Sequence, residues 1–176
     1  EDLTRYPTME AKSAAVREIN PIGKIPVLTD GAFILSESMA INLYLAKKYG
    51  RHLWPTGEQE QARVLQWSFF AVAELDPPLV QLMIERTFRK EGERNVENEK
   101  KNAETVQRPL AALEGHLATH PWLVGASFSV ADLNVAAVLS MAAGAKLDMT
   151  DYPHIQAWLK RCHDRPAWKK ATAPKP

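Results

Sequence analysis

The chain has 176 residues, one cysteine and a formal net charge of +1, from 22 Lys+Arg and 21 Asp+Glu. That length allows one or two domains, and the near-neutral charge gives no reason to expect a nucleic acid or an anionic membrane as partner. No apolar run approaches the ~20 residues of a membrane helix, and one cysteine excludes an internal disulfide, so we expect a cytoplasmic protein.

A short helix is expected over residues 9–19, followed by a β-hairpin. Residues 25–29 form the first predicted strand, which contains a proline, and residues 32–35 form the second. Asp30-Gly31 between them is the dipeptide that a two-residue type I′ turn favours, because both central residues of that turn need a positive φ.

A helix should begin directly after the hairpin. Ser36 is the expected N-cap, and Glu37 would place a negative charge in the first turn, where the helix dipole favours it. Gly50 is the expected end, because glycine accepts the left-handed conformation that often follows a helix.

The remainder of the chain reads as helices. Residues 51–58 are a predicted linker, and two prolines, Pro77 and Pro78, should kink or break the long apolar segment that follows. The expected helical segments are residues 59–87, 91–127, 129–144, 153–163 and 166–170.

Two motifs could carry chemistry. A proline in a strand usually marks an edge or a bulge, but a cis bond between Ile25 and Pro26 would leave the backbone of Ile25 unpaired and free to bind a ligand. Glu37 and Ser38 at a helix start would suit a head group with both a carboxylate and an ammonium, whereas ordinary helix capping is the simpler alternative.

Other polar residues have structural explanations. Ser129 and Asp132 have the spacing of a capping box, which concerns folding and not catalysis. His116 and His120 stand four residues apart on a helix, but no third ligand is apparent, so we expect no metal site. Cys162 falls in register with apolar residues and should be a buried thiol.

Taken together, these motifs resemble the glutathione S-transferase superfamily, in its bacterial soluble members. The resemblance rests on Asn-Pro-x-Gly-Lys-x-Pro-Val-Leu at 20–28, Glu-Ser-x-Ala-Ile at 37–41 and Ser-x-x-Asp at 129–132. It implies a mainly α (α+β) fold: a thioredoxin-like glutathione-binding domain over residues 1–50 and an all-helical domain over residues 59–176.

The resemblance also implies a glutathione site. Pro26 would be the cis-proline, Ile25 would pair through its backbone with the cysteinyl part of glutathione, and Glu37 and Ser38 would hold the γ-glutamyl end. Lys24 stands where some members reach the glycine carboxylate. Glutathione would be a co-substrate, and no metal is implied.

By the same resemblance, the second substrate would be a small hydrophobic electrophile, in a detoxifying conjugation by a homodimer. Its acceptor pocket would include Trp67, Phe70 and Trp168, although core packing explains these aromatics equally well. The alternatives are a non-catalytic assembly module, or a glutathione-dependent isomerase or peroxidase on the same fold.

The family's first domain begins with a strand–helix–strand segment that has no counterpart before residue 20. The residue that contacts the glutathione sulfur would lie in that segment, so no catalytic residue is assigned. We therefore expect the chain as printed to be inactive even if its parent protein is an enzyme.

Overall fold

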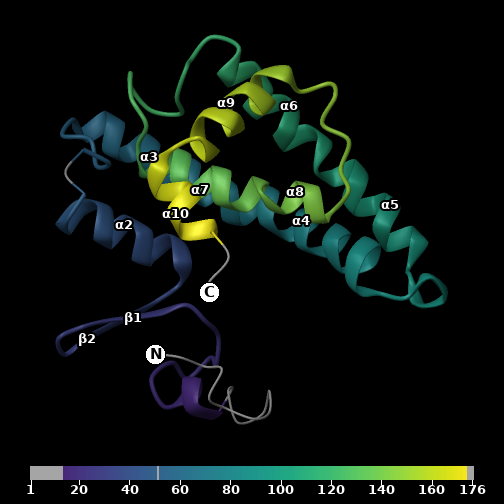
Figure 1. The fold of residues 1–176 in the computed structure, drawn as a ribbon, viewed down its shortest axis with the longest axis horizontal. Helices are drawn as coiled ribbons and strands as arrows, with labels where there is room; N and C mark the ends of the chain where they lie inside the picture. Colours follow the sequence, from purple (N-terminus) through teal and green to yellow (C-terminus); the bar gives the residue numbers. More distant parts are fainter. Residues whose placement is uncertain (1–13, 51, 174–176) are drawn as a thin grey trace. The chain divides into compact units, whose positions relative to one another are not determined.

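The computed structural model describes residues 14–50 and 52–173, and the chain divides into two compact units, Glu1–Arg51 and His52–Pro176 (Figure 1). In the first unit residues 14–17 are helical, and the rest of the helix expected over 9–19 lies largely outside the described residues. The second unit contains only helices and loops among its described residues.

Among its described residues, the first unit contains a two-stranded antiparallel sheet. Strand β1 spans Val27–Asp30 and strand β2 spans Phe33–Ser36, with Val27 opposite Ser36 and Asp30 opposite Phe33. The loop is therefore Gly31-Ala32, one residue later than predicted. Of these two residues only Gly31 has a positive φ, 62°, so the expected type I′ turn is wrong.

The side chain of Asp30 explains this shift. Its carboxylate accepts hydrogen bonds from the hydroxyls of Tyr44, at 2.7 Å, and Tyr49, at 3.2 Å, and it forms an ion pair with Lys48. These partners all lie on or next to the following helix, so they hold Asp30 at the end of the strand and not in the turn. These donors lower the pKa of the Asp30 carboxyl, and the hydrogen bond from the Lys48 ammonium has the largest effect.

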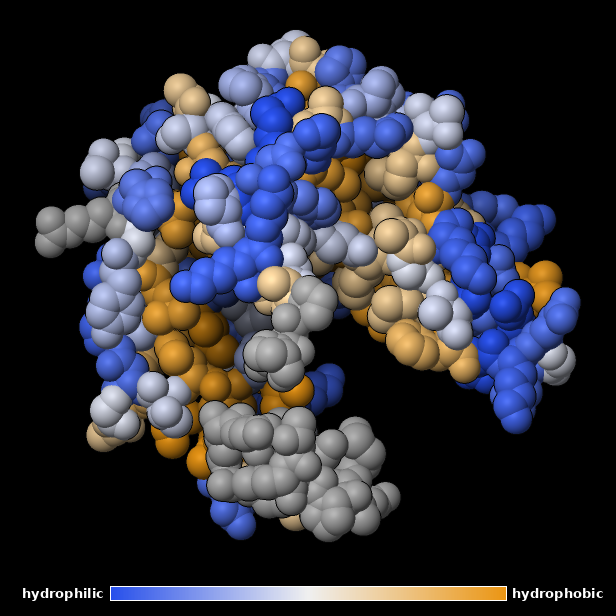
Figure 2. Space-filling model, viewed as in Figure 1, coloured by the Kyte–Doolittle hydropathy of each residue, from blue (hydrophilic) through white to orange (hydrophobic). Residues whose placement is uncertain are grey.

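Helix α2 spans Ser38–Lys48, and Glu37 precedes it with no side-chain cap. The predicted N-cap, Ser36, is instead the last residue of β2, because the strand pairing continues to it. Figure 2 shows hydrophobic residues at the surface over the hairpin and α2. Phe33 and Ile34 are among the exposed large apolar side chains of this unit.

One helical path runs from residue 58 to residue 88 of the second unit. It consists of α3 (Glu58–Phe70), a π-helical turn η2 (Ala71–Leu75), α4 (Asp76–Met83) and a second π-helical turn η3 (Ile84–Phe88). Pro77 and Pro78 occupy the start of α4, where a proline's missing N–H costs least. The wider turn before them replaces the predicted break.

The chain then reverses through a short turn, η4 (Glu91–Glu93), into α5 (Val96–Thr105) and α6 (Gln107–Leu117). The second helical path therefore stops at Leu117, ten residues before the predicted end. Residues 118–129 form a connecting segment that ends at the cap of the next helix.

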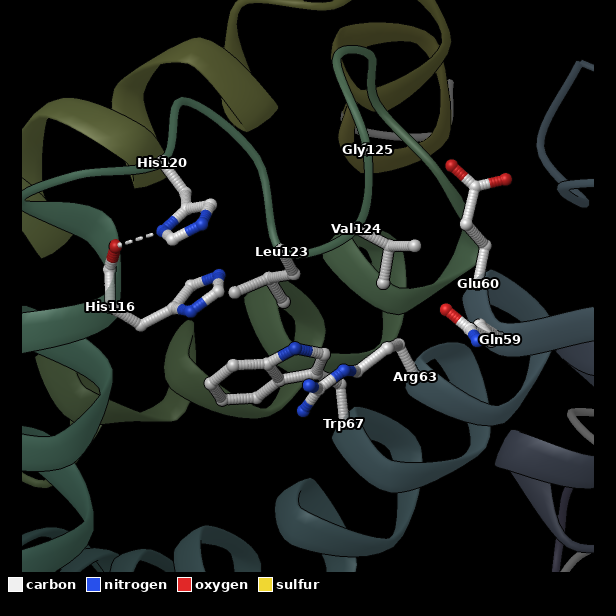
Figure 3. A pocket seen from close by; sticks show the side chains of 9 residues that line it. All are labelled: Gln59, Glu60, Arg63, Trp67, His116, His120, Leu123, Val124 and Gly125. Carbon is white, nitrogen blue, oxygen red and sulfur yellow. Dashed lines mark hydrogen bonds between the residues drawn. The ribbon is translucent and has the colours of Figure 1, made fainter. Parts of the chain in front are cut away.

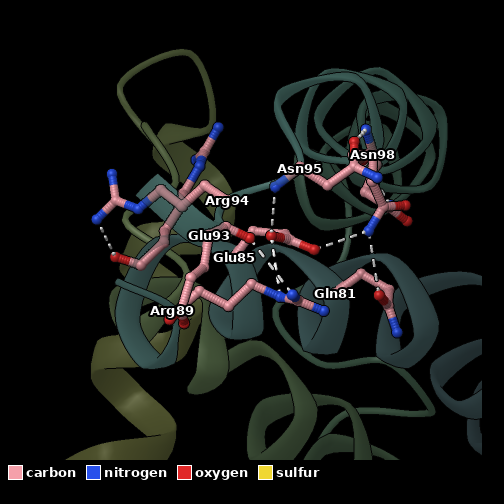
Figure 4. Close-up of polar contacts among 9 residues, drawn as sticks. Gln81, Glu85, Arg89, Glu93, Arg94, Asn95 and Asn98 are labelled. Atoms are coloured by element: carbon pink, nitrogen blue, oxygen red, sulfur yellow. Dashed lines mark hydrogen bonds and ion pairs between the residues drawn. The ribbon is translucent and has the colours of Figure 1, made fainter. Parts of the chain in front are cut away.

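A buried carboxylate stabilises this reversal (Figure 4). Glu85, which is 2% exposed, accepts hydrogen bonds from the backbone N–H of Asn95, at 2.9 Å, and from the side chain of Asn98, at 3.2 Å. Its other partner is the guanidinium of Arg89, at 3.3 Å. The Asn95 side chain in turn caps α5 by accepting from the N–H of Asn98.

The last helices are α7 (Val130–Leu139), α8 (Met141–Gly144), α9 (Pro153–His163) and α10 (Pro166–Thr172). The predicted capping box at the start of α7 is confirmed. The largest fully buried side chains of this unit come from five of its helical elements: Leu75, Leu79, Leu82, Leu110, Leu113, Leu139, Ile155 and Trp158.

Asp132 in the capping box is fully buried and accepts four hydrogen bonds. The N–H groups of Leu123 and Ser129 donate at 3.0 and 2.9 Å, the Ser129 hydroxyl at 3.2 Å, and the indole N–H of Trp158 at 2.9 Å. Burial raises the pKa of this carboxyl, and these donors oppose the rise. One side chain therefore joins the connecting segment, α7 and α9.

Candidate functional site

The loop before β1 is held in place by Asn20, which is 5% exposed. Its side-chain amide donates to the backbone carbonyl of Lys24 at 2.7 Å, and its backbone carbonyl accepts from the N–H of Gly23 at 2.7 Å. Gly23 has a φ of 72°, a conformation that glycine adopts without strain. This arrangement fixes the backbone that leads into Ile25.

The Ile25–Pro26 peptide bond is cis, which is the alternative that leaves the backbone of Ile25 available to a ligand. No described residue forms a hydrogen bond with the backbone of Ile25, whose side chain is 65% exposed. A backbone N–H and C=O left unpaired at the end of a strand can pair with the main chain of an extended peptide ligand.

The start of α2 offers a second set of free donors. The first backbone bond of the helix runs from the N–H of Ile41 to the carbonyl of Glu37, at 2.9 Å, so the N–H groups of residues 38–40 have no helical partner. The side chain of Glu37, the N-cap residue, does not cap them, and no other described side chain is seen to do so. Uncapped amides at the positive end of a helix bind a carboxylate well, and the adjacent Glu37 carboxylate can attract an ammonium.

The hairpin register brings these two features to one end of the sheet. Because Val27 is opposite Ser36, the Ile25–Pro26 bond and the Glu37–Ser38 pair are the next residues outward on the two strands. Glu37 also has a φ of 71° and a ψ of 115°, an unfavourable conformation for a residue with a side chain. Such strain is concentrated at functional sites.

Lys24, the least specific of the predicted glutathione residues, is exposed beside this end. Its carbonyl accepts from Asn20, and its ammonium forms no ion pair with a described residue. A cation there is available to a second carboxylate of a ligand.

Two of the three aromatic residues predicted for the acceptor pocket are in contact with each other. Trp67 and Phe70 touch edge to face, with ring centroids 5.2 Å apart. Trp168 instead stacks on His163 at 4.4 Å, and among the described residues no ring contact joins it to the other two. The acceptor pocket therefore stays a prediction.

Trp67 does line a pocket of about 370 Å³ in the helical unit (Figure 3). Most of its lining residues were not predicted from the sequence as a pocket, although Arg63, four residues before Trp67, lies on the same face of α3. The lining residues are Gln59, Glu60, Arg63, Trp67, His116, His120, Leu123, Val124 and Gly125.

The two predicted histidines stack on each other, and the cysteine is free and buried. The rings of His116 and His120 stack at 4.3 Å, and no group of three metal-ligating side chains occurs in residues 14–50 and 52–173. Cys162 is 1% exposed, and burial raises the pKa of its thiol to about 12. Within the same residues, no helix is both long enough and apolar enough to cross a membrane.

Two family models match the chain. The model "Glutathione S-transferase, C-terminal domain" matches residues 74–166, and the model "Glutathione S-transferase, N-terminal domain" matches residues 1–48. Among curated relatives, glutathione S-transferase 4 of Zea mays is 33% identical over 156 residues, which cover 86% of this chain and 70% of that protein.

A relative with another role is also similar. Elongation factor 1-gamma of Danio rerio is 33% identical over 153 residues, which cover 85% of this chain but 34% of that protein.

The solved structures agree with the sequence comparisons. The theta class glutathione S-transferase of Xanthomonas axonopodis pv. citri, with glutathione bound, superposes with a TM-score of 0.84 at 28% identity and covers 92% of this chain and 78% of that one. With both family models matched and the fold shared, the chain belongs to the glutathione S-transferase superfamily.

Proposed function

We propose that this chain binds glutathione and that it is a glutathione transferase, which joins the glutathione thiolate to small electrophiles. The observation that carries the proposal is the shared hairpin end, where the backbone of Ile25 has no hydrogen-bond partner among the described residues and lies beside the helix start at Ser38. The relatives named glutathione S-transferase support it.

Each group of the ligand has a partner of matching chemistry. The backbone of Ile25 would pair with the cysteinyl residue, while the α2 amides and the Ser38 hydroxyl would hold the γ-glutamyl carboxylate. Glu37 would attract the γ-glutamyl ammonium, and Lys24 the glycine carboxylate.

In the proposed reaction the thiol loses its proton to solvent, and the thiolate attacks an electrophilic carbon. A carbon–sulfur bond forms while a leaving group such as chloride departs with its bonding electrons. Stabilising the thiolate by ~2 pKa units corresponds to about 2.7 kcal/mol, which one or two well-placed donors supply. No described residue is assigned to that contact.

Calorimetric titration with glutathione tests the binding site. Ser38→Ala should weaken binding about ten-fold, because it removes a hydrogen bond to a charged group. Ser36→Ala is the matched control, since Ser36 lies in β2 and not at the helix start. Equal affinities of the two variants would contradict the assignment, and no glutathione binding by the unaltered chain would contradict the function.

Conjugation is measured separately, with 1-chloro-2,4-dinitrobenzene as the electrophile. The chain as printed is compared with a version that includes any residues preceding Glu1 in its gene. Binding without conjugation by either version would favour the alternative of an assembly module, for which the similarity to elongation factor 1-gamma is the supporting observation. Isomerase and peroxidase substrates distinguish the remaining alternative.

We propose further that the electrophile is small and hydrophobic, with Trp67, Phe70 and Trp168 as the predicted contacts, and that the protein acts in the cytoplasm. The buried, free Cys162 is compatible with a reducing compartment.

We also propose a homodimer, on the basis of an apolar stripe on α3 and η2. Leu65, Phe69 and Val72 share one face, and Phe69 is 68% exposed. Phe69→Glu should convert a dimer to a monomer in sedimentation velocity, because it would bury a charge in the interface. Val96→Glu, on the exposed face of α5, is the control and should leave the dimer intact.

A further inference from the structure

We propose that the pocket around Trp67 and Arg63 binds a planar aromatic monocarboxylate. This binding activity is separate from glutathione conjugation, and all nine lining residues belong to the helical unit. Its volume of about 370 Å³ lies within the range of ~300–1,000 Å³ that small-molecule sites occupy.

Arg63 supplies the charge that a carboxylate needs. It is the only lining residue with a permanent positive charge, and it forms no ion pair with a described residue. One of its N–H groups donates to the side chain of Gln66 at 2.9 Å, which leaves the other donors of the guanidinium for a ligand. A guanidinium and a carboxylate form two parallel hydrogen bonds, a geometry that favours a carboxylate over a neutral group.

The remaining walls favour a flat, apolar body. Figure 3 shows the indole of Trp67 next to Arg63, with the imidazoles of His116 and His120 beside them and Leu123 and Val124 across the pocket. The Trp67 and His116 ring centroids are 4.8 Å apart. An aromatic ligand would therefore meet ring edges and aliphatic side chains while its carboxylate reaches the guanidinium.

The charges limit the ligand to one negative charge. The Glu60 carboxylate lies at the rim and repels a dianion, while burial, followed by the neighbouring His120, lowers the pKa of His116. The Nε2 atom of His116 is buried and makes no hydrogen bond within the described residues. Arg63 is thus the only permanent positive charge in the lining.

A second hollow of about 330 Å³ adjoins the first and shares Gln59 and Arg63 with it. A ligand with two fused rings can therefore extend past the guanidinium without leaving the surface of α3. This observation favours a bicyclic carboxylate over benzoate as the probe.

The test is a titration of the full chain with 2-naphthoate in the absence of glutathione, followed by calorimetry and by the C2–H proton signals of the histidine rings. We expect saturable binding that shifts the signals of His116 and His120 but not that of His154, which lies outside the pocket. No saturable binding, or binding that leaves both ring signals unmoved, would overturn the proposal.

Variants separate the pocket from nonspecific binding. Arg63→Gln should raise the Kd for 2-naphthoate about ten-fold or more, because a hydrogen-bonded charge pair is lost. Arg108→Gln makes the same change of charge outside the pocket and should not alter the Kd. Equal effects of the two substitutions, or equal binding of 2-naphthamide and 2-naphthoate, would overturn the role of Arg63.

Glutathione keeps this result separate from the proposed function. Ser38→Ala should reduce glutathione affinity and leave the Kd for 2-naphthoate unchanged. Arg63→Gln should have the opposite pattern. Failure of 2-naphthoate binding alone would therefore leave the glutathione site standing.

Discussion

Glu37, at the proposed glutathione site, has a backbone conformation that is unfavourable for a residue with a side chain. Its φ of 71° would be relaxed in glycine, yet the chain has a carboxylate-bearing residue directly before α2. Residues whose backbone is held in a sparsely populated φ/ψ region cost of order 1–3 kcal/mol each. Glu37 therefore lowers the stability of the fold, and in the proposed site it places a negative charge next to the helix start.

A substitution at this residue should reveal that exchange. Glu37→Gly should raise the free energy of unfolding by roughly 1 kcal/mol, because strain is relieved by more than the added chain entropy removes. The same variant should lose at least about ten-fold in glutathione affinity. Urea denaturation measures the first effect and calorimetry the second.

Glu37→Gln is the control for this prediction. It retains the side-chain volume and the strain, so its stability should stay within about 0.5 kcal/mol of the unaltered chain while its glutathione affinity falls. A gain in stability with glutamine as large as that with glycine would show that charge, and not backbone strain, is the cause.

At the scale of single elements, α7 depends on Asp132. Asp132→Asn replaces an acceptor oxygen with an amide that cannot accept, and at least one buried donor among Leu123, Ser129 and Trp158 is left unpaired. We expect a loss of about 2–4 kcal/mol in the free energy of unfolding. Asp151→Asn, at an exposed position, makes the same change of charge and should cost less than about 0.5 kcal/mol.

The α4–α5 reversal should respond to pH through Glu85. The Asn95 backbone N–H and, more weakly, the Asn98 side chain lower the pKa of Glu85 below its unfolded value, since burial only partly opposes them. The contribution of this group is therefore fully present above the unfolded pKa of ~4.3 and is lost as the pH falls through the folded pKa.

Thermal unfolding between pH 3 and pH 7 measures this contribution. Glu85→Gln should lower the Tm at pH 7, and its Tm should fall less than that of the unaltered chain as the medium is acidified. Glu91→Gln, at an exposed position, should preserve the slope of the unaltered chain. Parallel slopes for all three proteins would contradict the prediction.

Elements with complete local signals were predictable from the sequence. Helix α9 has its predicted bounds because Pro153 stands at its first position, and the capping box of α7 depends only on Ser129 and Asp132. The hairpin register was not predictable, because the partners that hold Asp30 come from α2.

The candidate sites divide in the same way. The glutathione residues proposed at 24–26 and 37–38 could be named from the sequence because the motif and the helix start are both local features, and the structure has the cis bond and the helix start at those positions. The pocket was not found, because Arg63 is an ordinary exposed cation until the end of α6 and the segment 118–129 are placed beside it. The π-helical turns were also missed, since a residue pattern with a period of 3.6 does not distinguish them from α-helix.

For the whole molecule, the two units differ in their means of independent stability. A sheet of two strands is at best marginally stable by itself, whereas the helical unit has a continuous set of buried leucines. We expect residues 52–176, produced alone, to unfold cooperatively and to bind 2-naphthoate with the Kd of the full chain. Circular dichroism during heating, followed by calorimetry, measures both properties.

Residues 1–50 produced alone are the counterpart of that experiment. They should show no cooperative transition in the same measurement. A noncooperative transition of residues 52–176, with a native-like transition of residues 1–50, would contradict the assignment of stability to the helical unit.

The hydrogen bonds from Leu123 and Ser129 to Asp132 also identify a place where the chain could be cut without loss of the fold. Between those two residues the chain passes through Gly125, Ala126 and Ser127, all exposed, while both flanks are fixed by one carboxylate. Residues 125–127 belong to neither α6 nor α7. New chain ends could therefore be opened there, with the old ends of the helical unit joined, and α6 and α7 would keep their packing in the permuted protein.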